Sequence, residues 1–198
     1  MTTITKSFFD KDAQGREIYA YTLLDGEYSA VILDRGGIIK NLFVPDKNGV
    51  KTDVVLGYDD MRGYDTNDGY LSALIGRFGN RISKGQVCLD GRNYQFFCND
   101  KSNHLHGGKE GFDKKIWNAE IITTQDGNQR LALTILSPDG DENYPGPLTI
   151  RMTYTFNDKN ETFVTYRVDR MCNIKVSEEI TDDINVVKRY ESVHIRLP

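Results

Sequence analysis

The chain has 198 residues, enough for one domain with a buried core, and its 25 basic and 29 acidic residues give a formal net charge of -4. This balance argues against a nucleic-acid-binding surface, and no apolar run approaches the roughly 20 residues that span a bilayer. The amino terminus lacks a basic start followed by an apolar core, so we expect no secretory signal, and we expect free thiols in a reducing cytoplasm at Cys88, Cys98 and Cys172.

Turn dipeptides divide most of the chain into short runs of residues that favour β-strands. Asp-Gly and Asn-Gly pairs are strong hairpin signals, because a tight turn requires positive φ at its central residues. Four such pairs each separate two strand-like runs. In chain order, the predicted hairpins join Glu17–Leu24 to Glu27–Leu33 at Asp25-Gly26, Ile38–Val44 to Thr52–Leu56 at Asn48-Gly49, Gln86–Leu89 to Asn93–Phe97 at Asp90-Gly91, and Ala119–Thr124 to Arg130–Leu136 at Asp126-Gly127.

A fifth hairpin is predicted further along the chain, with its turn at Asn157–Asn160. Its first arm, Leu148–Phe156, alternates apolar and polar residues, which indicates a strand with one buried face. Its second arm is Thr162–Val168. No stretch shows a helical hydrophobic period over several turns. These patterns predict a single all-β domain built as an antiparallel β-sandwich.

The segment Ile75–Ile82 is the first candidate for a ligand site. It reads Ile-Gly-Arg-Phe-Gly-Asn-Arg-Ile and places Arg77, Asn80 and Arg81 among glycines. Glycines allow a ligand to approach the backbone closely, while arginine and asparagine supply several donors and one amide acceptor, a combination that suits hydroxyl-rich ligands. The alternative is a loop with two surface arginines, and the residues alone favour that alternative.

The segment Asn103–Gly108 carries two histidines, His104 and His106. In an extended chain such residues point to one face, so a metal site is one interpretation. It lacks an evident third ligand, since the remaining histidine is the distant His194, and we predict no metal. A second interpretation is a general acid or base, because histidine titrates near neutral pH. The third is a core or loop histidine without a chemical role.

The loop Ser137–Gly146 is acidic, with carboxylates at Asp139, Asp141 and Glu142. Carboxylates of this kind are able to act as acids or bases. Such clusters are more often solvated loops, and we interpret this one in that way.

Several segments, taken together and in order, resemble the aldose 1-epimerase (galactose mutarotase) family. Each alone is weakly specific, but five in register are highly specific. The resemblance covers about Lys6 to Val168 and implies a large antiparallel sandwich, called a supersandwich, which would be incomplete here at its carboxy-terminal side. The matching segments are Asp53–Tyr58, Ile75–Ile82, Asn103–Gly108 with Gly111–Trp117, Ser137–Gly140 with Tyr144–Gly146, and the strand ending in Thr153–Thr155.

The resemblance implies an isomerase that interconverts the α and β anomers of aldohexoses such as galactose and glucose. A base removes the proton of the anomeric hydroxyl and an acid protonates the ring oxygen, so that the ring opens, the C1–C2 bond rotates and the ring closes again. No metal or organic cofactor takes part. By their match to the family motifs, Asn80 and Arg81 bind the sugar, and His106 also lines the site and helps to polarise the ring oxygen, which makes His106 the catalytic candidate.

The resemblance stops near Asp169. The family continues with an Asn-His motif whose histidine is the general acid, then a sugar-binding aspartate and a glutamate that is the general base. Arg170–Pro198 contains no such motif, and the surroundings of His194 do not match it. We therefore expect residues 1–169 to form the amino-terminal part of the sandwich and residues 170–198 to be a divergent tail, produced by a frameshift or truncation. The chain is then expected to lack the acid and the base.

Three hypotheses for the function remain open. The chain is a fragment of an aldose 1-epimerase, a non-catalytic carbohydrate-binding protein that keeps Asn80, Arg81 and His106, or a decayed gene product. The expected ligand is a small sugar, galactose or glucose, and no nucleic acid or membrane partner is expected. A sandwich without its later strands would expose a sheet edge, so self-association is a further expectation.

Overall fold

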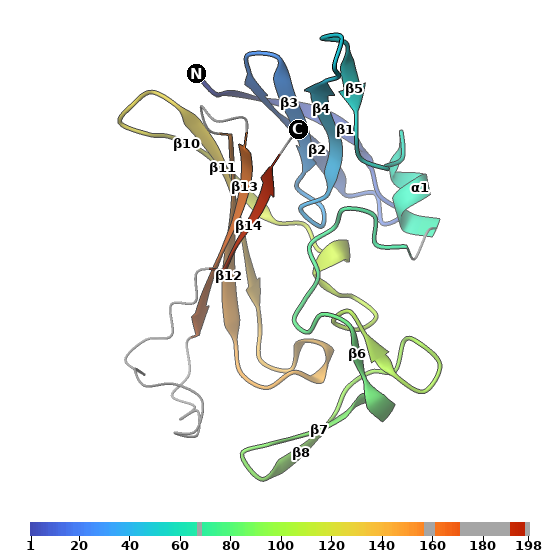
Figure 1. Ribbon diagram of the computed structural model, residues 1–198. Coiled ribbons are helices and arrows are strands. Elements are labelled where there is room, and N and C mark those ends of the chain that lie inside the picture. The colour runs from blue at the N-terminus through green and yellow to red at the C-terminus, as the bar shows by residue number, and fades with distance from the viewer. Residues whose placement is uncertain (67–68, 157–160, 171–190, 197–198) are drawn as a thin grey trace.

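Two five-stranded antiparallel sheets contain most of the strands (Figure 1). The computed structural model describes residues 1–66, 69–156, 161–170 and 191–196. The first sheet has the order β1 (Thr3–Lys11), β2 (Glu17–Asp25), β3 (Tyr28–Leu33), β4 (Ile39–Pro45) and β5 (Lys51–Asp53). The second has the order β10 (Asn118–Thr123), β11 (Gln129–Ser137), β12 (Leu148–Phe156), β13 (Glu161–Arg170) and β14 (Glu191–Arg196).

Smaller elements lie between the two sheets in the sequence, except for one helical turn that lies between β11 and β12. They are two strand pairs and four short helical turns. The pairs are β6 (Arg81–Ile82) with β9 (His104–Leu105), and β7 (Gln86–Leu89) with β8 (Arg92–Gln95). The helical turns are α1 (Met61–Thr66), η1 (Ser83–Gly85), η2 (Phe112–Lys114) and η3 (Asp141–Asn143).

The predicted hairpins are confirmed wherever the structure describes them. Strands β2 and β3, β4 and β5, β7 and β8, and β10 and β11 pair antiparallel across the four Asp-Gly and Asn-Gly turns. Strands β12 and β13 pair as the fifth hairpin requires, from Leu148 opposite Arg170 to Phe156 opposite Thr162. The turn at 157–160 lies outside the described residues. Strand β1, which pairs with β2, is an addition to the predicted set.

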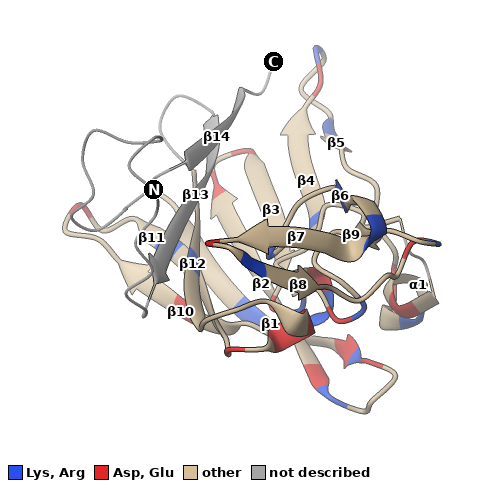
Figure 2. Cartoon of the chain, turned by 90° about the horizontal axis from the view of Figure 1, so that it is seen from below, with Lys and Arg blue, Asp and Glu red and all other residues tan. Residues whose placement is uncertain are grey.

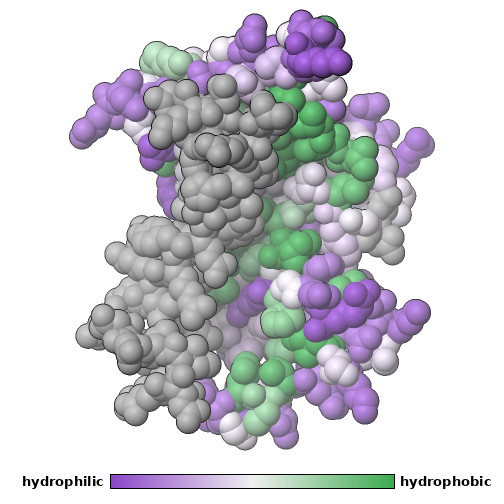
Figure 3. All heavy atoms as spheres, in the orientation of Figure 1, coloured by the Kyte–Doolittle hydropathy of each residue, from purple (hydrophilic) through white to green (hydrophobic). Residues whose placement is uncertain are grey.

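The two sheets share one hydrophobic core, which confirms the antiparallel β-sandwich. Alternate residues of β12, including Met152 and Tyr154, are buried against side chains of the first sheet such as Leu23 and Ile32. The Tyr154 hydroxyl donates a hydrogen bond of 2.7 Å to the carbonyl oxygen of Gly37, which fastens one sheet to the other. In Figure 3, hydrophobic side chains gather in a band down the middle of the face shown.

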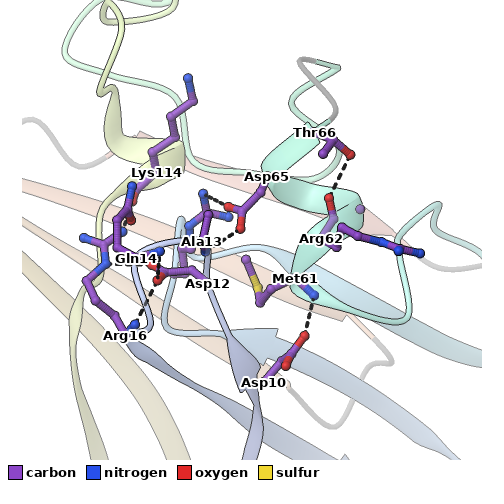
Figure 4. A network of polar contacts seen from close by, with 12 residues as sticks. Asp10, Asp12, Ala13, Gln14, Arg16, Met61, Arg62, Asp65, Thr66 and Lys114 are labelled. Carbon is purple, nitrogen blue, oxygen red and sulfur yellow. Dashed lines mark hydrogen bonds and ion pairs between the residues drawn. The ribbon is translucent and has the colours of Figure 1, made fainter.

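Helix α1 packs against part of the outer face of the first sheet. Met61, at the start of this helix, is fully buried in a second cluster that includes Ile18 and Leu33. The helix is also fastened to the end of β1 and to the loop after it, because Asp10 accepts a hydrogen bond from the Met61 amide and Asp65 accepts one from the Ala13 amide (Figure 4). A helix of six residues is too short for a sustained hydrophobic period, which agrees with the expectation from the sequence.

The end of the chain contributes one described strand. Glu191–Arg196 (β14) pairs antiparallel with Glu161–Tyr166 of β13 and forms an edge of the second sheet. The remainder of the expected tail, 171–190 with 197–198, lies outside the described residues, and so does Cys172. The boundary at residue 169 therefore stays a prediction.

The described surface matches the composition in two respects. Basic and acidic residues are scattered along the described part of the chain in Figure 2, without a continuous run of basic residues in that view. Cys88 and Cys98 are free thiols, as expected. No helix among the described residues has the length and apolar character needed to cross a membrane.

Candidate functional site

The two motif segments come together as a short pair of strands. Arg81 and Ile82 of β6 pair with Leu105 and His104 of β9, in antiparallel register. Antiparallel pairing places the residue before one strand beside the residue after the other. Asn80 and His106 are therefore neighbours, although 26 positions separate them in the sequence.

Asn80 and His106 are joined by two hydrogen bonds. The Asn80 amide donates to Nδ1 of His106 at 3.0 Å, and the His106 amide donates to the Asn80 carbonyl oxygen at 3.1 Å. Both residues adopt left-handed backbone conformations, with φ of 72° and 50°. Because Nδ1 accepts a hydrogen bond, the proton of the neutral imidazole belongs on Nε2. The ring is thereby fixed as a donor through Nε2.

The surroundings of His106 favour the neutral ring. Partial burial lowers the pKa of this histidine, and the nearby positive charge of Arg81 lowers it further. The ring of Tyr70 meets the imidazole edge to face, with 4.7 Å between ring centroids. At neutral pH, His106 is thus an uncharged hydrogen-bond donor placed beside an aromatic wall.

Arg81 is exposed but anchored. Its Nε donates to Oδ2 of Asp100 at 2.6 Å, and its side chain is 54% exposed. Its backbone amide donates to Oδ1 of Asn80 at 2.9 Å, so that the side chain of Asn80 is also held in place. With Nε occupied, the two terminal nitrogens of the guanidinium and the side-chain NH₂ of Asn80 are available to hydroxyl groups of a ligand.

His104 has a structural position, as the third interpretation of the motif allowed. It is fully buried, its Nδ1 lies 2.8 Å from the Phe97 carbonyl oxygen, and its Nε2 lies 2.6 Å from the hydroxyl of Tyr144. Nδ1 must donate to the carbonyl, so Nε2 accepts from the phenol. His106 is not extended, and the two rings therefore do not share a face. Among the described residues, no group of three or more potential metal ligands occurs.

Arg77 is not one of two surface arginines in a loop, as the alternative interpretation of this segment had it. Its guanidinium reaches the end of β11 and the loop that follows it, with Nε donating to Oγ of Ser137 at 2.9 Å. Its terminal nitrogens donate to the carbonyl oxygens of Ser137, Pro138 and Gly146 at 2.7–2.8 Å. Every nitrogen of the fork is used, so Arg77 fastens the segment before Asn80 to the second sheet. That interpretation is therefore wrong for Arg77, while Arg81 is exposed as it predicted.

The acidic loop is also more than a solvated cluster. Both carboxylate oxygens of Glu142 accept backbone hydrogen bonds, from Lys109 at 2.8 Å and Glu110 at 3.0 Å. Asp141 forms an ion pair of 2.7 Å with Lys115. The solvated-loop interpretation is therefore wrong for these two residues, because Glu142 accepts from the backbone that follows the His106 motif and Asp141 pairs with the side chain of Lys115.

Three residues near the site carried no clear signal in the sequence. Tyr70 supports the His106 ring and Asp100 anchors Arg81. Asn99 satisfies the backbone of the motif, since its side chain bonds both the amide and the carbonyl of Leu105 and the carbonyl of Gly108. An Asn-Asp pair just before a histidine motif is a weak hint of such a role, because short polar side chains often bond nearby backbone.

The β-sandwich of this chain is similar to the solved structures of sugar epimerases. The galactose 1-epimerase from Lactobacillus acidophilus is similar with a TM-score of 0.73 and 21% identity over 86% of this chain and 49% of that one. An aldose epimerase homologue from C. elegans is similar with a TM-score of 0.66 and 24% identity over 86% of this chain and 46% of that one. At these identities the likeness establishes the fold.

Sequence comparison supplies the family. The family model of aldose 1-epimerase matches residues 19–171. Human galactose mutarotase is 37% identical over 168 residues, which are 84% of this chain and 47% of that protein. The aldose 1-epimerase of Escherichia coli K12 is 32% identical over 151 residues, 75% of this chain and 42% of that protein. The chain therefore belongs to the aldose 1-epimerase family, and it spans about half the length of the curated relatives that it matches.

Proposed function

We propose that this chain provides the sugar-binding part of an aldose 1-epimerase site and that its ligand is an aldohexose, galactose or glucose. The observation that carries the proposal is the pairing of Asn80 with His106, which leaves the Nε2 proton of a neutral imidazole free to donate. Arg81, anchored by Asp100, and the side-chain amide of Asn80 bind sugar hydroxyls beside His106. Family membership supports the same assignment.

In the proposed reaction, His106 donates its Nε2 hydrogen bond to the ring oxygen of the sugar. A base takes the proton of the anomeric hydroxyl, the O–H electrons form the C1 carbonyl, and the C1–O5 bond breaks as an acid protonates O5. Rotation about C1–C2 and the reverse steps give the other anomer. His106 polarises O5, while Arg81 and Asn80 hold the ring in position for these transfers.

The acid and the base are proposed to be missing from these 198 residues. The family match ends at residue 171, and no Asn-His pair occurs in the sequence from Arg170 to Pro198. Each proton-transfer group contributes about 10²–10⁴-fold to such a reaction. Without both groups, we expect sugar binding with negligible turnover. A frameshift or truncation near Asp169 remains our explanation, and translation of the encoding DNA in all three frames tests it.

Polarimetry of freshly dissolved α-galactose tests the catalytic part of the proposal. We expect the rate of mutarotation with the purified chain to equal the rate in buffer. Acceleration that disappears in His106→Ala would contradict the proposed loss of acid and base. Calorimetric titration with galactose tests the binding part, with Arg81→Ala as the site variant and Arg92→Ala, at an exposed arginine of β8, as its matched control.

A non-catalytic carbohydrate-binding protein is the second candidate, favoured by the presence of the binding residues alone. Stabilisation by sugar without any change in mutarotation is expected from both candidates, so the translated DNA separates them: the missing Asn-His motif in another frame supports the epimerase fragment, and its absence from all three frames supports the binding protein. A decayed gene product would instead fail to give soluble, folded chain. We also propose a cytoplasmic location, which the two free thiols support, and self-association through an edge of the second sheet. Sedimentation at several concentrations measures the self-association.

A further inference from the structure

The stretch 137–146, which runs from the end of β11 to the loop before β12, contacts both segments that present the proposed sugar site. Arg77, just before β6, donates to carbonyl oxygens of this stretch at 2.7–2.8 Å. Tyr144, in the same stretch, places its hydroxyl 2.6 Å from Nε2 of His104 in β9. The same stretch of chain is therefore fastened to the segments of both β6 and β9, which carry the site residues.

The hydrogen bonds of the His104 ring run in one direction. Its Nδ1 lies 2.8 Å from the Phe97 carbonyl oxygen, which only accepts, so Nδ1 donates and Nε2 of the neutral ring accepts from the phenol of Tyr144. Burial raises the pKa of Tyr144 to about 12, so the phenol keeps its proton at neutral pH. Hydrogen bonds in such a chain polarise and strengthen one another. The ring of His104 is thus held at both nitrogens.

The bond between Tyr144 and His104 is shielded from water. His104 is fully buried and Tyr144 is only 8% exposed. The ring of Phe96 stacks on that of Tyr144, with 4.2 Å between centroids, and also lies against His104, with 5.3 Å between centroids. A buried acceptor that loses its donor has no water at hand to replace it. Removal of the phenol hydroxyl is therefore expected to disturb the position of the His104 ring.

The strand pair that presents Asn80 and His106 is too short to fix its own register firmly. Strands β6 and β9 have two residues each, and an isolated pair of strands is at best marginally stable in water. His104 lies opposite Ile82 in this pair. A displacement of His104 would carry His106 with it and break the 3.0 Å bond from the Asn80 amide to Nδ1 of His106. Contacts outside the pair must therefore hold β9 in place.

We propose that Tyr144 is a positioning residue of the sugar site, whose hydroxyl holds His104 and thereby keeps the His106 ring on the Asn80 amide. It acts through His104, while the donors offered to the ligand are those of Asn80, Arg81 and His106. The proposal rests on the function proposed above for its link to sugar binding. The effect on the His106 ring is independent of any sugar and is measurable without one.

Nitrogen NMR of the His106 imidazole in Tyr144→Phe tests the proposal, with the signal assigned by its absence from His106→Ala. In the unaltered chain we expect a neutral ring protonated at Nε2 alone, with its pKa below 6.5. In Tyr144→Phe we expect a mixture of the two neutral tautomers, a pKa that returns towards 6.5, and galactose affinity lower by about threefold to tenfold. The matched control is Tyr154→Phe, which removes another buried hydroxyl, the donor to the Gly37 carbonyl oxygen at 2.7 Å in the core. It should lower stability but leave the His106 signal and the affinity unchanged.

The outcomes separate positioning from general loosening of the fold. An unchanged His106 signal in folded Tyr144→Phe overturns the proposal, and so does an equal change in Tyr154→Phe. If Tyr144→Phe does not fold, His104→Phe, which removes the acceptor in place of the donor, is measured with the same expectation, and an unchanged His106 signal there is again negative. Failure of the unaltered chain to bind galactose would contradict the proposed function, whereas the imidazole signal would still decide whether Tyr144 positions His106.

Discussion

The amide of Asn80 donates to Nδ1 of His106, and the amide of His106 donates to the carbonyl of Asn80. The orientation of the imidazole ring is therefore fixed by hydrogen bonds of the backbone. A protonated imidazole would present Nδ1–H to the Asn80 N–H and lose the bond. The pairing therefore selects the neutral ring, in the same direction as burial and the Arg81 charge.

The first prediction concerns pH. The pKa of His106 is lowered in the folded chain. Its contribution to the free energy of unfolding is therefore fully present above pH 6.5, the ordinary pKa of histidine. As pH falls below 6.5, the unfolded chain takes up the proton first, so the contribution is lost between 6.5 and the folded pKa. Sugar affinity should persist to a lower pH than an ordinary histidine allows. Proton NMR titration of the imidazole measures the pKa directly, and a value at or above 6.5 would contradict the pairing argument.

A second prediction concerns Tyr144. Burial raises the pKa of its phenol to about 12, so the folded chain keeps the proton when the unfolded chain loses it. The stabilising contribution is present below pH 10 and is lost as pH rises from 10 towards 12. Tyr144→Phe leaves Nε2 of His104 without its donor, so we expect a cost of roughly 1–3 kcal/mol at neutral pH. Urea unfolding at several pH values measures both effects, and the variant should show a flatter alkaline slope.

A third prediction distinguishes the two arginines of the same motif. Arg77→Ala removes the whole guanidinium fork from the β11–β12 loop, and we expect a loss of about 2–4 kcal/mol of unfolding free energy. Arg77→Lys should recover only part, because an ammonium group cannot make the planar fork. Arg81→Ala should cost less than about 1 kcal/mol, since its ion pair is exposed. Equal losses for Arg77 and Arg81 would refute the distinction.

A fourth prediction concerns Asp100 as a positioning residue. Asp100→Ala frees the Arg81 side chain, so galactose affinity should fall about threefold to tenfold while stability changes by less than about 1 kcal/mol. In Arg81→Ala, the further change Asp100→Ala should have almost no effect on affinity, because the anchored group is already absent. Additive losses in the double variant would show that Asp100 acts independently of Arg81.

The sequence predicted the local parts of the fold well. The Asp-Gly and Asn-Gly turns depend on a few neighbouring residues, and the alternation in Leu148–Phe156 depends on one strand alone, so both were visible without long-range information. The relation between Asn80 and His106 was not, because it depends on the register of β6 and β9. Family resemblance placed both residues at a site, but only the fold shows how they are joined.

The two arginines and the two histidines of the motifs also show that local sequence does not reveal long-range partners. Arg77 and Arg81 have similar neighbours, yet only Arg77 faces the loop between β11 and β12. His104 and His106 are two residues apart, yet a positive φ at His106 turns the second ring away from the first. No local pattern separates the members of either pair. Which one is structural is decided by partners 40–69 residues distant in the chain.

The Arg77 fork also has a consequence for folding. Its carbonyl partners lie 60–69 residues further along the chain, so none of these bonds forms until a long loop has closed and the β11–β12 connection is in place. Contacts of such separation are made late, because the chain entropy of closure comes first. The segment that presents Asn80 should therefore become protected from amide hydrogen exchange after the hairpins of the first sheet, so that the proposed sugar-binding surface is among the last parts of the molecule to acquire its native order.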